Sequence, residues 1–353
     1  MRKISYKLKL YYLRRIKKIK RKDNKRRAAN NTKVRTNLKA PAILDLVSNF
    51  DKSAIFFQEI RNISEKSPRH FYINFEPIRS ISASSALILA AEMDRIKRIS
   101  GKGIKVINFH KWDQNIRDLL GGMGMYDLLS IQNADKSKWN PESPEERFMK
   151  FQTGNKANGD DAIKLRNIIS GVVGALPGSN NLQKGLTEAM TNVSNHAYPD
   201  DFLLESLFKK KQWWMSASFN NITKKLTILF YDQGIGIPET LPRTIKEKFR
   251  QLIHLLPSLN DDGKMIEAAV KLGRSRTEEE HRGGGLEDIK NYISNQNIEN
   301  GYFRIYSNKG EFHYKKHGEK EEENVVNRSQ KLQGTLIEWQ VCVKEQKEKK
   351  YDN

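Results

Sequence analysis

The sequence predicts a mixed α/β protein of two domains. Between residues 41 and 132, and again over 161–343, short runs of strand-forming residues alternate with longer segments of helical periodicity. A polar stretch at 133–160, with two prolines and two glycines, separates these regions and is interpreted as a linker. The length of 353 residues is enough for two domains with tails at 1–40 and 344–353.

The first 40 residues are a basic arm. They hold 17 Lys or Arg and one acid, Asp23, a net charge of +16, whereas the other 313 residues hold 46 basic and 41 acidic residues. Apolar residues recur at roughly helical spacing over about 4–27, which is typical of a basic amphipathic helix. We expect the arm to bind nucleic acid or an anionic membrane surface. A solvated tail without a specific partner is the equal alternative.

Composition excludes several classes of protein. No run of about 18 apolar residues occurs, so no transmembrane segment is expected. Lysine and arginine interrupt the apolar residues of the N-terminus throughout, which excludes a signal peptide. The single cysteine, Cys342, excludes an intramolecular disulfide and a cysteine-cluster zinc site. The expected location is therefore the cytoplasm.

In the first domain, strands and helices are predicted to alternate. A serine at 82, 84 or 85 can cap the first helix, and a glycine pair ends the second. The predicted elements are strands at 71–75 and 105–109 and helices at 83–99 and 113–120.

This series of a strand, a serine pair opening a helix, a second strand and a closing helix resembles the STAS domain, the fold of bacterial anti-sigma antagonists. The resemblance covers about 60 residues and ends in "GMGMYDLL". In the family the serine pair usually stands in an Asp-Ser-Ser-Gly sequence, whereas this chain has Ala83-Ser84-Ser85-Ala86. We therefore favour a helix start over phosphorylation at Ser84 or Ser85.

The second domain is predicted to contain one long helix at 182–197 with a line of polar residues. Glu188, Asn192 and His196 are spaced at i, i+4 and i+8, so an α-helix places them on one face. The amide oxygen of Asn192 suits Mg²⁺, which keeps waters and takes phosphate oxygens as co-ligands. Glu188 can accept a proton from a water or hydroxyl near a γ-phosphate. A polar helix face with a histidine at its C-terminal end is the alternative.

A second stretch, Asp232-Gln-Gly234-Ile-Gly236-Ile-Pro238, follows a predicted strand at 226–231. A carboxylate at a strand end can accept a hydrogen bond from an exocyclic amine, such as that of adenine. Gly234 and Gly236 leave space for a planar base against the backbone. An ordinary β-turn is the alternative.

A third stretch precedes a predicted helix at 286–293. The residues Gly283, Gly284 and Gly285 before Leu286 free backbone N–H groups that can hold phosphate, and Arg282 adds a cation. No Gly-Lys-Ser/Thr follows, so the segment is not a Walker A loop. The other predicted strands of this domain lie at 213–219, 301–307 and 335–343.

In this order the three stretches resemble the N, G1 and G2 boxes of the GHKL ATPase superfamily, over about 160–343. The stretch "EAMTNVSNHAYP" resembles most closely the N box of anti-sigma-factor serine kinases. The resemblance implies a nucleotide site with Glu188 as the base, Asn192 as the magnesium ligand, His196 nearby, Asp232 as the adenine reader, the three glycines as the phosphate loop and Thr335 supporting the adenine end. It also implies that residues 240–282 form an ATP lid.

Together the resemblances imply a STAS-like α/β domain followed by a GHKL-type α/β sandwich that binds ATP and Mg²⁺. We expect an ATP-binding regulatory protein that controls a protein partner, acting as a magnesium-dependent ATPase or a serine protein kinase. The alternative is a nucleotide-dependent binding module without turnover, with an arm that binds nucleic acid. A homodimer also stays open.

Overall fold

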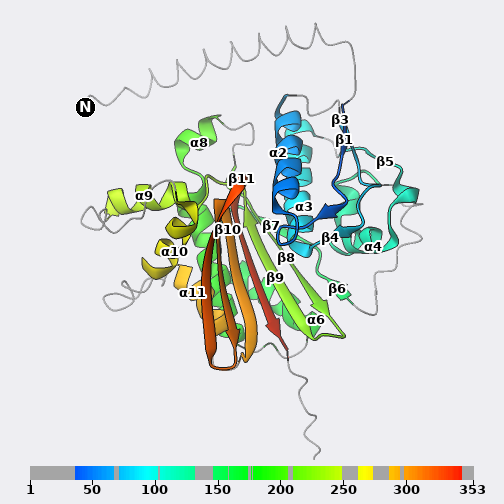
Figure 1. The fold of residues 1–353 in the computed structure, drawn as a ribbon. Coiled ribbons are helices and arrows are strands. Elements are labelled where there is room, and N and C mark those ends of the chain that lie inside the picture. Colours follow the sequence, from blue (N-terminus) through cyan, green and yellow to red (C-terminus); the bar gives the residue numbers. More distant parts are fainter. Residues whose placement is uncertain are drawn as a thin grey trace, which may run out of the picture.

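The computed structural model describes residues 36–66, 71–101, 104–131, 146–157, 159–173, 176, 178–205, 210–248, 261–272, 286–294 and 298–343. Most of the basic arm lies outside these residues, as do the tail at 344–353 and the segment Arg282–Gly285. The described residues form a mixed α/β structure with three sheets, of three, six and two strands (Figure 1). In this described part, no helix combines the length and apolar character needed to cross a bilayer.

The N-terminal unit, residues 36–131, contains a parallel sheet of order β1-β3-β5. The strands are β1 (Thr36–Lys39), β3 (Phe71–Asn74) and β5 (Val106–Ile107), and the crossovers between them are α2 (Phe50–Lys66) and α3 (Ala83–Ser100). Right-handed crossovers in this strand order place both helices on the same face of the sheet. The predicted strand–helix alternation is therefore confirmed, with α2 as an additional helix.

Helix α3 starts at a serine cap. The Ser82 hydroxyl accepts the backbone N–H of Ser85 at 3.3 Å, and Ser84 and Ser85 are both buried. This geometry fits the helix-start interpretation of the serine pair. The remaining elements of the unit are β2 (Ile43–Leu44), which pairs with β4 (Ser80–Ile81), the 3₁₀ turns η1 (Phe109–Lys111) and η2 (Met125–Asp127), and α4 (Gln114–Gly122).

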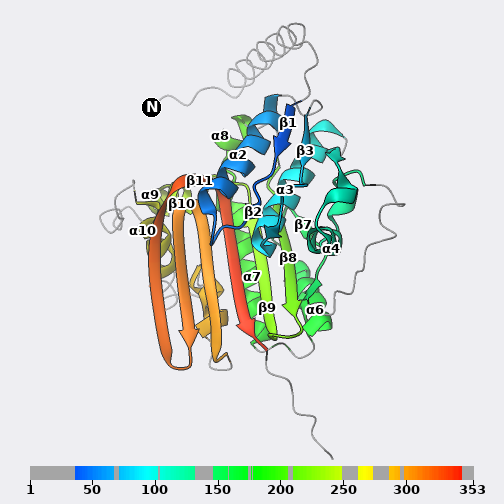
Figure 2. The same ribbon diagram turned by 45° about the vertical axis from the view of Figure 1, so that its right-hand side comes forward.

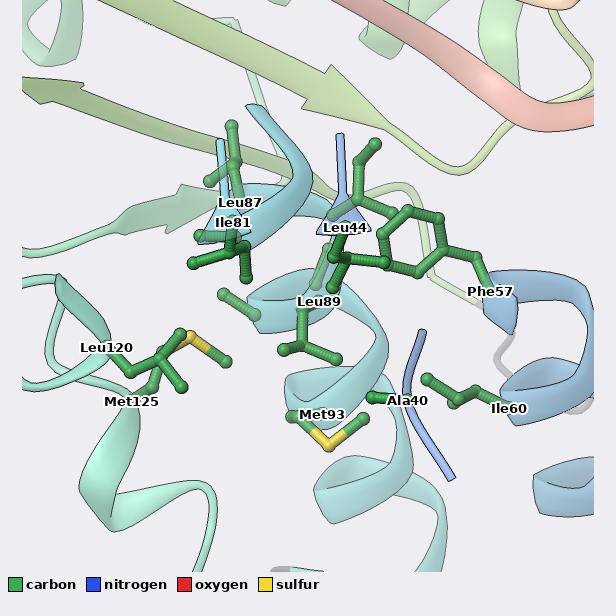
Figure 3. Close-up of a cluster of buried hydrophobic side chains, with 14 of the residues drawn as sticks. Ala40, Leu44, Phe57, Ile60, Ile81, Leu87, Leu89, Met93, Leu120 and Met125 are labelled. Atoms are coloured by element: carbon green, nitrogen blue, oxygen red, sulfur yellow. The ribbon is translucent and has the colours of Figure 1, made fainter. Parts of the chain in front are cut away.

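The core of the N-terminal unit is apolar and closely packed. Side chains from β2, α2, α3 and α4 point toward one another in Figure 3. Each side chain labelled in Figure 3 is 8% exposed or less, so this core is closed to water. They include Leu44, Phe57, Ile60, Leu87, Leu89, Met93 and Leu120.

The C-terminal unit, residues 146–343, is built on a six-stranded antiparallel sheet of order β10-β11-β9-β8-β6, with β7 also paired to β8. Its four predicted strands are present, and the last two are longer than predicted. The linker prediction for 133–160 is wrong in part, because two short strands in this segment pair with β8. The strands are β6 (Glu146–Phe148), β7 (Gln152–Gly154), β8 (Trp213–Asn220), β9 (Lys225–Asp232), β10 (Asn300–His317) and β11 (Lys320–Cys342).

Helices cover both faces of this sheet. Helices of the C-terminal unit, among them α6, α7, α10 and α11, pack against one face, and α2 and α3 pack against the other, on β8, β9 and β11 (Figure 2). The helices of the C-terminal unit are α6 (Gly159–Val173), α7 (Ser179–Asn192), the π-turn η3 (Val193–Ala197), α8 (Asp200–Glu205), α9 (Ile237–Lys248), α10 (Asp262–Leu272) and α11 (Leu286–Ser294).

The two units share one hydrophobic core. The ring of Phe50, at the start of α2, stacks on Tyr306 of β10 with a centroid distance of 5.7 Å. Burial of each large apolar side chain contributes roughly 1.5–3 kcal/mol, so the units stabilise each other. The sheet residues in the shared core are Trp214, Leu229, Tyr231, Tyr306, Leu332 and Leu336.

Candidate functional site

Asp232 ends β9 directly opposite Thr335 of β11. Strand alternation turns its side chain toward the same face as Phe230, which is the face covered by α7. The carboxylate accepts the backbone N–H of Gly234 at 2.8 Å and the backbone N–H of Thr335. Burial nevertheless raises the pKa of Asp232 to about 7, because these two donors only partly replace water. The residue is only 6% exposed, so a protonatable group lies inside the fold.

The turn after Asp232 docks on the end of the helix that carries Glu188. The backbone N–H of Ile235 donates to the carbonyl oxygen of Ala197 at 2.9 Å. A Cβ atom added at Gly234 would lie 2.2 Å from the same oxygen, so this close approach requires glycine. The first and second sequence stretches are therefore in direct contact.

Tyr198 is a part of the site that the sequence reasoning did not assign. Its hydroxyl accepts the backbone N–H of Gln233 at 2.8 Å and donates to the carbonyl oxygen of Gln212 at 2.7 Å. Burial, and then the nearby charge of Asp232, raise the pKa of Tyr198 well above its ordinary value. The phenol therefore stays protonated and fixes the turn on its α7 side.

On the other side, the turn is held by β10 and β11. Gly334 has φ +82°, and a Cβ atom there would lie 1.9 Å from the carbonyl oxygen of Asp232. The Ser307 hydroxyl donates to the carbonyl oxygen of Gly334 at 2.9 Å and contacts the Thr335 hydroxyl at 3.1 Å. It also accepts the N–H of Ile237 at 2.8 Å, at the start of α9. Ser307 thus joins three backbone segments around Asp232.

One residue further along β10, the chain bulges toward the same turn. Asn308 has φ +54°, and the pairing of β10 with β11 shifts register on both sides of it. Its Nδ2 donates to the carbonyl oxygen of Ile235 at 3.1 Å. Gly236, with φ +88°, turns the chain from this contact into α9. The bulge therefore brings an amide onto the glycine-containing turn.

Helix α7 presents Glu188 and Asn192 one turn apart, both half-buried. The helix changes from α to π geometry at Val193, so the prediction of one continuous α-helix through Ala197 is wrong. A π-turn closes on i→i+5 bonds and shifts the following side chains out of the α register. Glu188 and Asn192 keep their shared stripe, and His196 lies in the turn that docks against Gly234.

The third sequence stretch is described only at its last residue. Leu286 starts α11, as predicted, and α11 packs against α7. Gly283, Gly284 and Gly285, which are expected to hold phosphate, and the neighbouring Arg282 lie outside the described residues. The helix that starts at Leu286 packs on the helix that carries Glu188.

The magnesium site expected at Asn192 would need few protein ligands. Among the residues that the structure describes, no cluster of three or more His, Cys, Asp or Glu can hold a metal ion. Mg²⁺ does not require such a cluster, because it keeps its waters and takes substrate phosphates as co-ligands. Asn192 can supply one amide oxygen to such an ion.

Segments distant in the sequence thus meet around the carboxyl end of β9: the end of α7, the turn after Asp232, the bulge of β10 and the Gly334–Thr335 segment of β11. No family model matches this chain, and no curated protein matches it. The function is therefore inferred from the residues of the site.

Proposed function

We propose that the chain is an ATP-binding regulatory protein in which Asp232 recognises adenine. The observation that carries the proposal is the burial of the Asp232 carboxyl group, with a pKa raised to about 7, beside a turn built on Gly234. Burying such a group costs free energy unless a partner compensates it. Strongly perturbed carboxyl groups therefore occur more often at functional sites. The exocyclic amine of adenine can donate a hydrogen bond to this carboxylate.

The neighbouring helix supports a nucleotide site. Asn192 would supply an amide oxygen to Mg²⁺, which when bound neutralises charge on nucleotide phosphates. Glu188, one turn earlier and half-buried, would hold the proton of an attacking water or hydroxyl. Helix α11 begins directly after the three glycines and packs on the same helix. Backbone N–H groups at its start would then face the phosphates.

The sheet arrangement supports the resemblance to the GHKL superfamily. An antiparallel sheet with α7, α10 and α11 on one face is an α/β sandwich, and the three motif stretches follow in the order that the resemblance implies. The N-terminal unit, with its parallel strands and paired helices, is the STAS-like part of the proposal. ATP occupancy would then control a protein partner. The partner would bind to this unit, to the expected ATP lid at residues 240–282, or to the basic arm.

A nucleotide-dependent binding module without turnover is the second candidate. Phosphate release by the wild-type chain separates the ATPase from this module, and labelled phosphate on a partner identifies a kinase. The first test is binding of ATP and GTP to wild-type protein and to Asp232→Asn. Loss of one charge-assisted hydrogen bond is expected to cost roughly 1.5–3 kcal/mol, or about ten- to a hundred-fold in ATP affinity. Equal wild-type affinities for ATP and GTP would exclude the assignment of Asp232.

A further inference from the structure

Two contacts tie the N-terminal unit to both strands that form the Asp232 site. The side chain of Gln233, the residue after Asp232, points to the opposite face of the sheet, where its Nε2 donates to Oε1 of Glu92 on α3 at 2.9 Å. From α2, the Nε2 of Gln58 donates to the carbonyl oxygen of Lys331 on β11. One contact holds the turn after β9, and the other holds the segment of β11 that precedes the residues facing Asp232.

The Glu92 end of the first contact is held firmly. Glu92 is 1% exposed, and its carboxylate accepts Arg61 Nε at 3.2 Å and Arg95 Nη2 at 2.8 Å. Burial alone would raise the pKa of Glu92, but the charges of Arg61 and Arg95 outweigh it and the pKa is lowered. Arg95 in turn donates to the Ser64 hydroxyl of α2 at 2.8 Å. A charged acceptor makes the bond from Gln233 stronger than one between neutral groups.

Gln233 links the two faces of the sheet. Its backbone N–H is bound by Tyr198 on the α7 side, while its side chain is bound by Glu92 on the α3 side. Its amide orientation is fixed, because the Oε1 atom in place of Nε2 would face the Glu92 carboxylate. A displacement of α3 must therefore displace Gln233 together with its neighbours Asp232 and Gly234.

We propose that Glu92 and Gln58 are positioning residues of the nucleotide site, so that docking of the N-terminal unit and nucleotide binding are linked; the inference rests on the proposed function. Neither side chain needs to touch nucleotide. Each holds a backbone segment that aligns Asp232 or its partner strand. Because linkage is reciprocal, nucleotide bound at Asp232 tightens the docking of α2 and α3 by the factor by which docking tightens nucleotide binding.

The test uses Gln233→Leu in the full chain, which removes the bond to Glu92 and nearly keeps the side-chain volume. Trp214→Phe is the matched control, because it removes another bond across the same interface, from Trp214 Nε1 on β8 to Asp94 Oδ2 at 3.0 Å, and leaves the hydrogen bonds of the turn in place. The dissociation constant for ATP should rise at least about fivefold in Gln233→Leu, the lower end of typical coupling between sites. In Trp214→Phe it should stay within about twofold of the wild type, which is below the range of typical coupling between sites, even if the thermal midpoint falls.

Hydrogen exchange tests the linkage separately from stability. If the contact between Gln233 and Glu92 only stabilised the fold, ATP would not change amide exchange in α2 and α3. Saturating ATP should slow amide exchange in α2 and α3 of the wild type and of Trp214→Phe, and this slowing should be lost in Gln233→Leu. Suppose that ATP binds, but that Gln233→Leu has the affinity of the wild type or that ATP does not change exchange in α2 and α3. The linkage is then wrong and the proposed function stands. If the wild type binds no adenine nucleotide, the proposed function fails and the linkage fails with it.

Discussion

The carbonyl oxygen of Ala197 accepts the backbone N–H of Ile235, and this hydrogen bond joins the turn after β9 to the end of the helix that carries Glu188 and Asn192. The bond depends on Gly234, whose missing side chain lets the two backbones meet. Two short sequence stretches that lie 35 to 40 residues apart therefore act as one structural unit.

Gly234→Ala is expected to separate these two backbones. The new Cβ atom would lie 2.2 Å from the Ala197 oxygen, so the turn must move and its hydrogen bond must lengthen. Overpacking of this kind destabilises by about 1–3 kcal/mol. ATP affinity should fall as well, because Asp232 moves with the turn. The measurements are urea unfolding and ATP titration.

Gly171→Ala is the control for this variant. Gly171 lies in α6, and a Cβ atom there meets nothing within 4 Å. Alanine in a helix interior is favoured over glycine by roughly 0.5–1 kcal/mol, so this variant should be as stable as the wild type or more so. Equal stability and equal ATP affinity for the two alanine variants would show that the close approach at Gly234 is unimportant.

The raised pKa of Asp232 predicts a specific pH dependence of stability. Because the folded pKa of about 7 lies above the ordinary value of 3.8, the folded state holds this proton more tightly than the unfolded state. The contribution of the protonated Asp232 to the free energy of unfolding is largest below about pH 4 and is lost as the pH rises through about 7. Over this window, wild-type stability should fall relative to that of Asp232→Asn, by at most about 1.4 kcal/mol per pH unit.

Chemical unfolding of both proteins at half-unit pH steps, without nucleotide, measures this difference. Groups other than Asp232 titrate in both proteins and cancel in the comparison. Parallel stability curves between pH 4 and pH 8 would mean that the Asp232 carboxyl group is not desolvated as the structure indicates.

Removal of residues 1–35 tests the basic arm. The deletion should stop at 35, because β1 begins at Thr36 and the side chains of Leu38 and Ala40 are buried in the N-terminal unit. The predicted arm of 1–40 is therefore too long by these last residues. Nucleic-acid binding should disappear on deletion, and ATP binding should stay unchanged.

Salt separates binding by charge from other binding in this experiment. If the arm neutralises six or more phosphates, affinity for duplex DNA should fall by about 10³-fold or more between 50 and 200 mM salt. If the affinity for duplex DNA is unchanged by the deletion, or does not depend on salt, the arm is not a polyanion-binding segment.

The sequence predicted elements whose own pattern is strong. The helix at 83–99, the strands at 213–219 and 226–231, and the helix after Leu286 are all present within a residue or two. Strands β6 and β7 have three residues each, which are enough to pair with β8. Three residues are too few to show the alternation of a strand in the sequence. The polar segment around them therefore resembled a linker, and it forms strands only because it pairs with β8 at the edge of the sheet.

The site was predictable only at residues that form motifs. Asp232 and Gly234 stand out in the sequence, and their mutual hydrogen bond is local. Ser307 and Asn308 carry no motif, since their role arises from a bulge that brings them to a turn about 70 residues earlier. A signal for Tyr198 was present, as it directly follows the polar helix stretch, but its bond to Gln233 is visible only in the fold.

Glu188 and Asn192 allow chemistry to be separated from binding. Glu188→Ala should keep ATP and magnesium bound but slow turnover by about a hundred-fold or more, as expected for loss of a general base. Asn192→Ala should instead lose the magnesium dependence of nucleotide binding, because it removes an amide ligand. ATP titrations with and without Mg²⁺, together with phosphate release, are measured for both variants.

Lys184→Ala controls for disturbance of α7. Lys184 is exposed on the same helix, one turn before Glu188, so its loss should leave both assays unchanged. A general loosening of the helix would instead affect binding and turnover together in all three variants. Should the wild type bind ATP without hydrolysis or phosphotransfer, the role of Glu188 as a base fails. The binding module without turnover then replaces the enzyme, while the assignment of Asn192 still stands or falls on the magnesium dependence of binding.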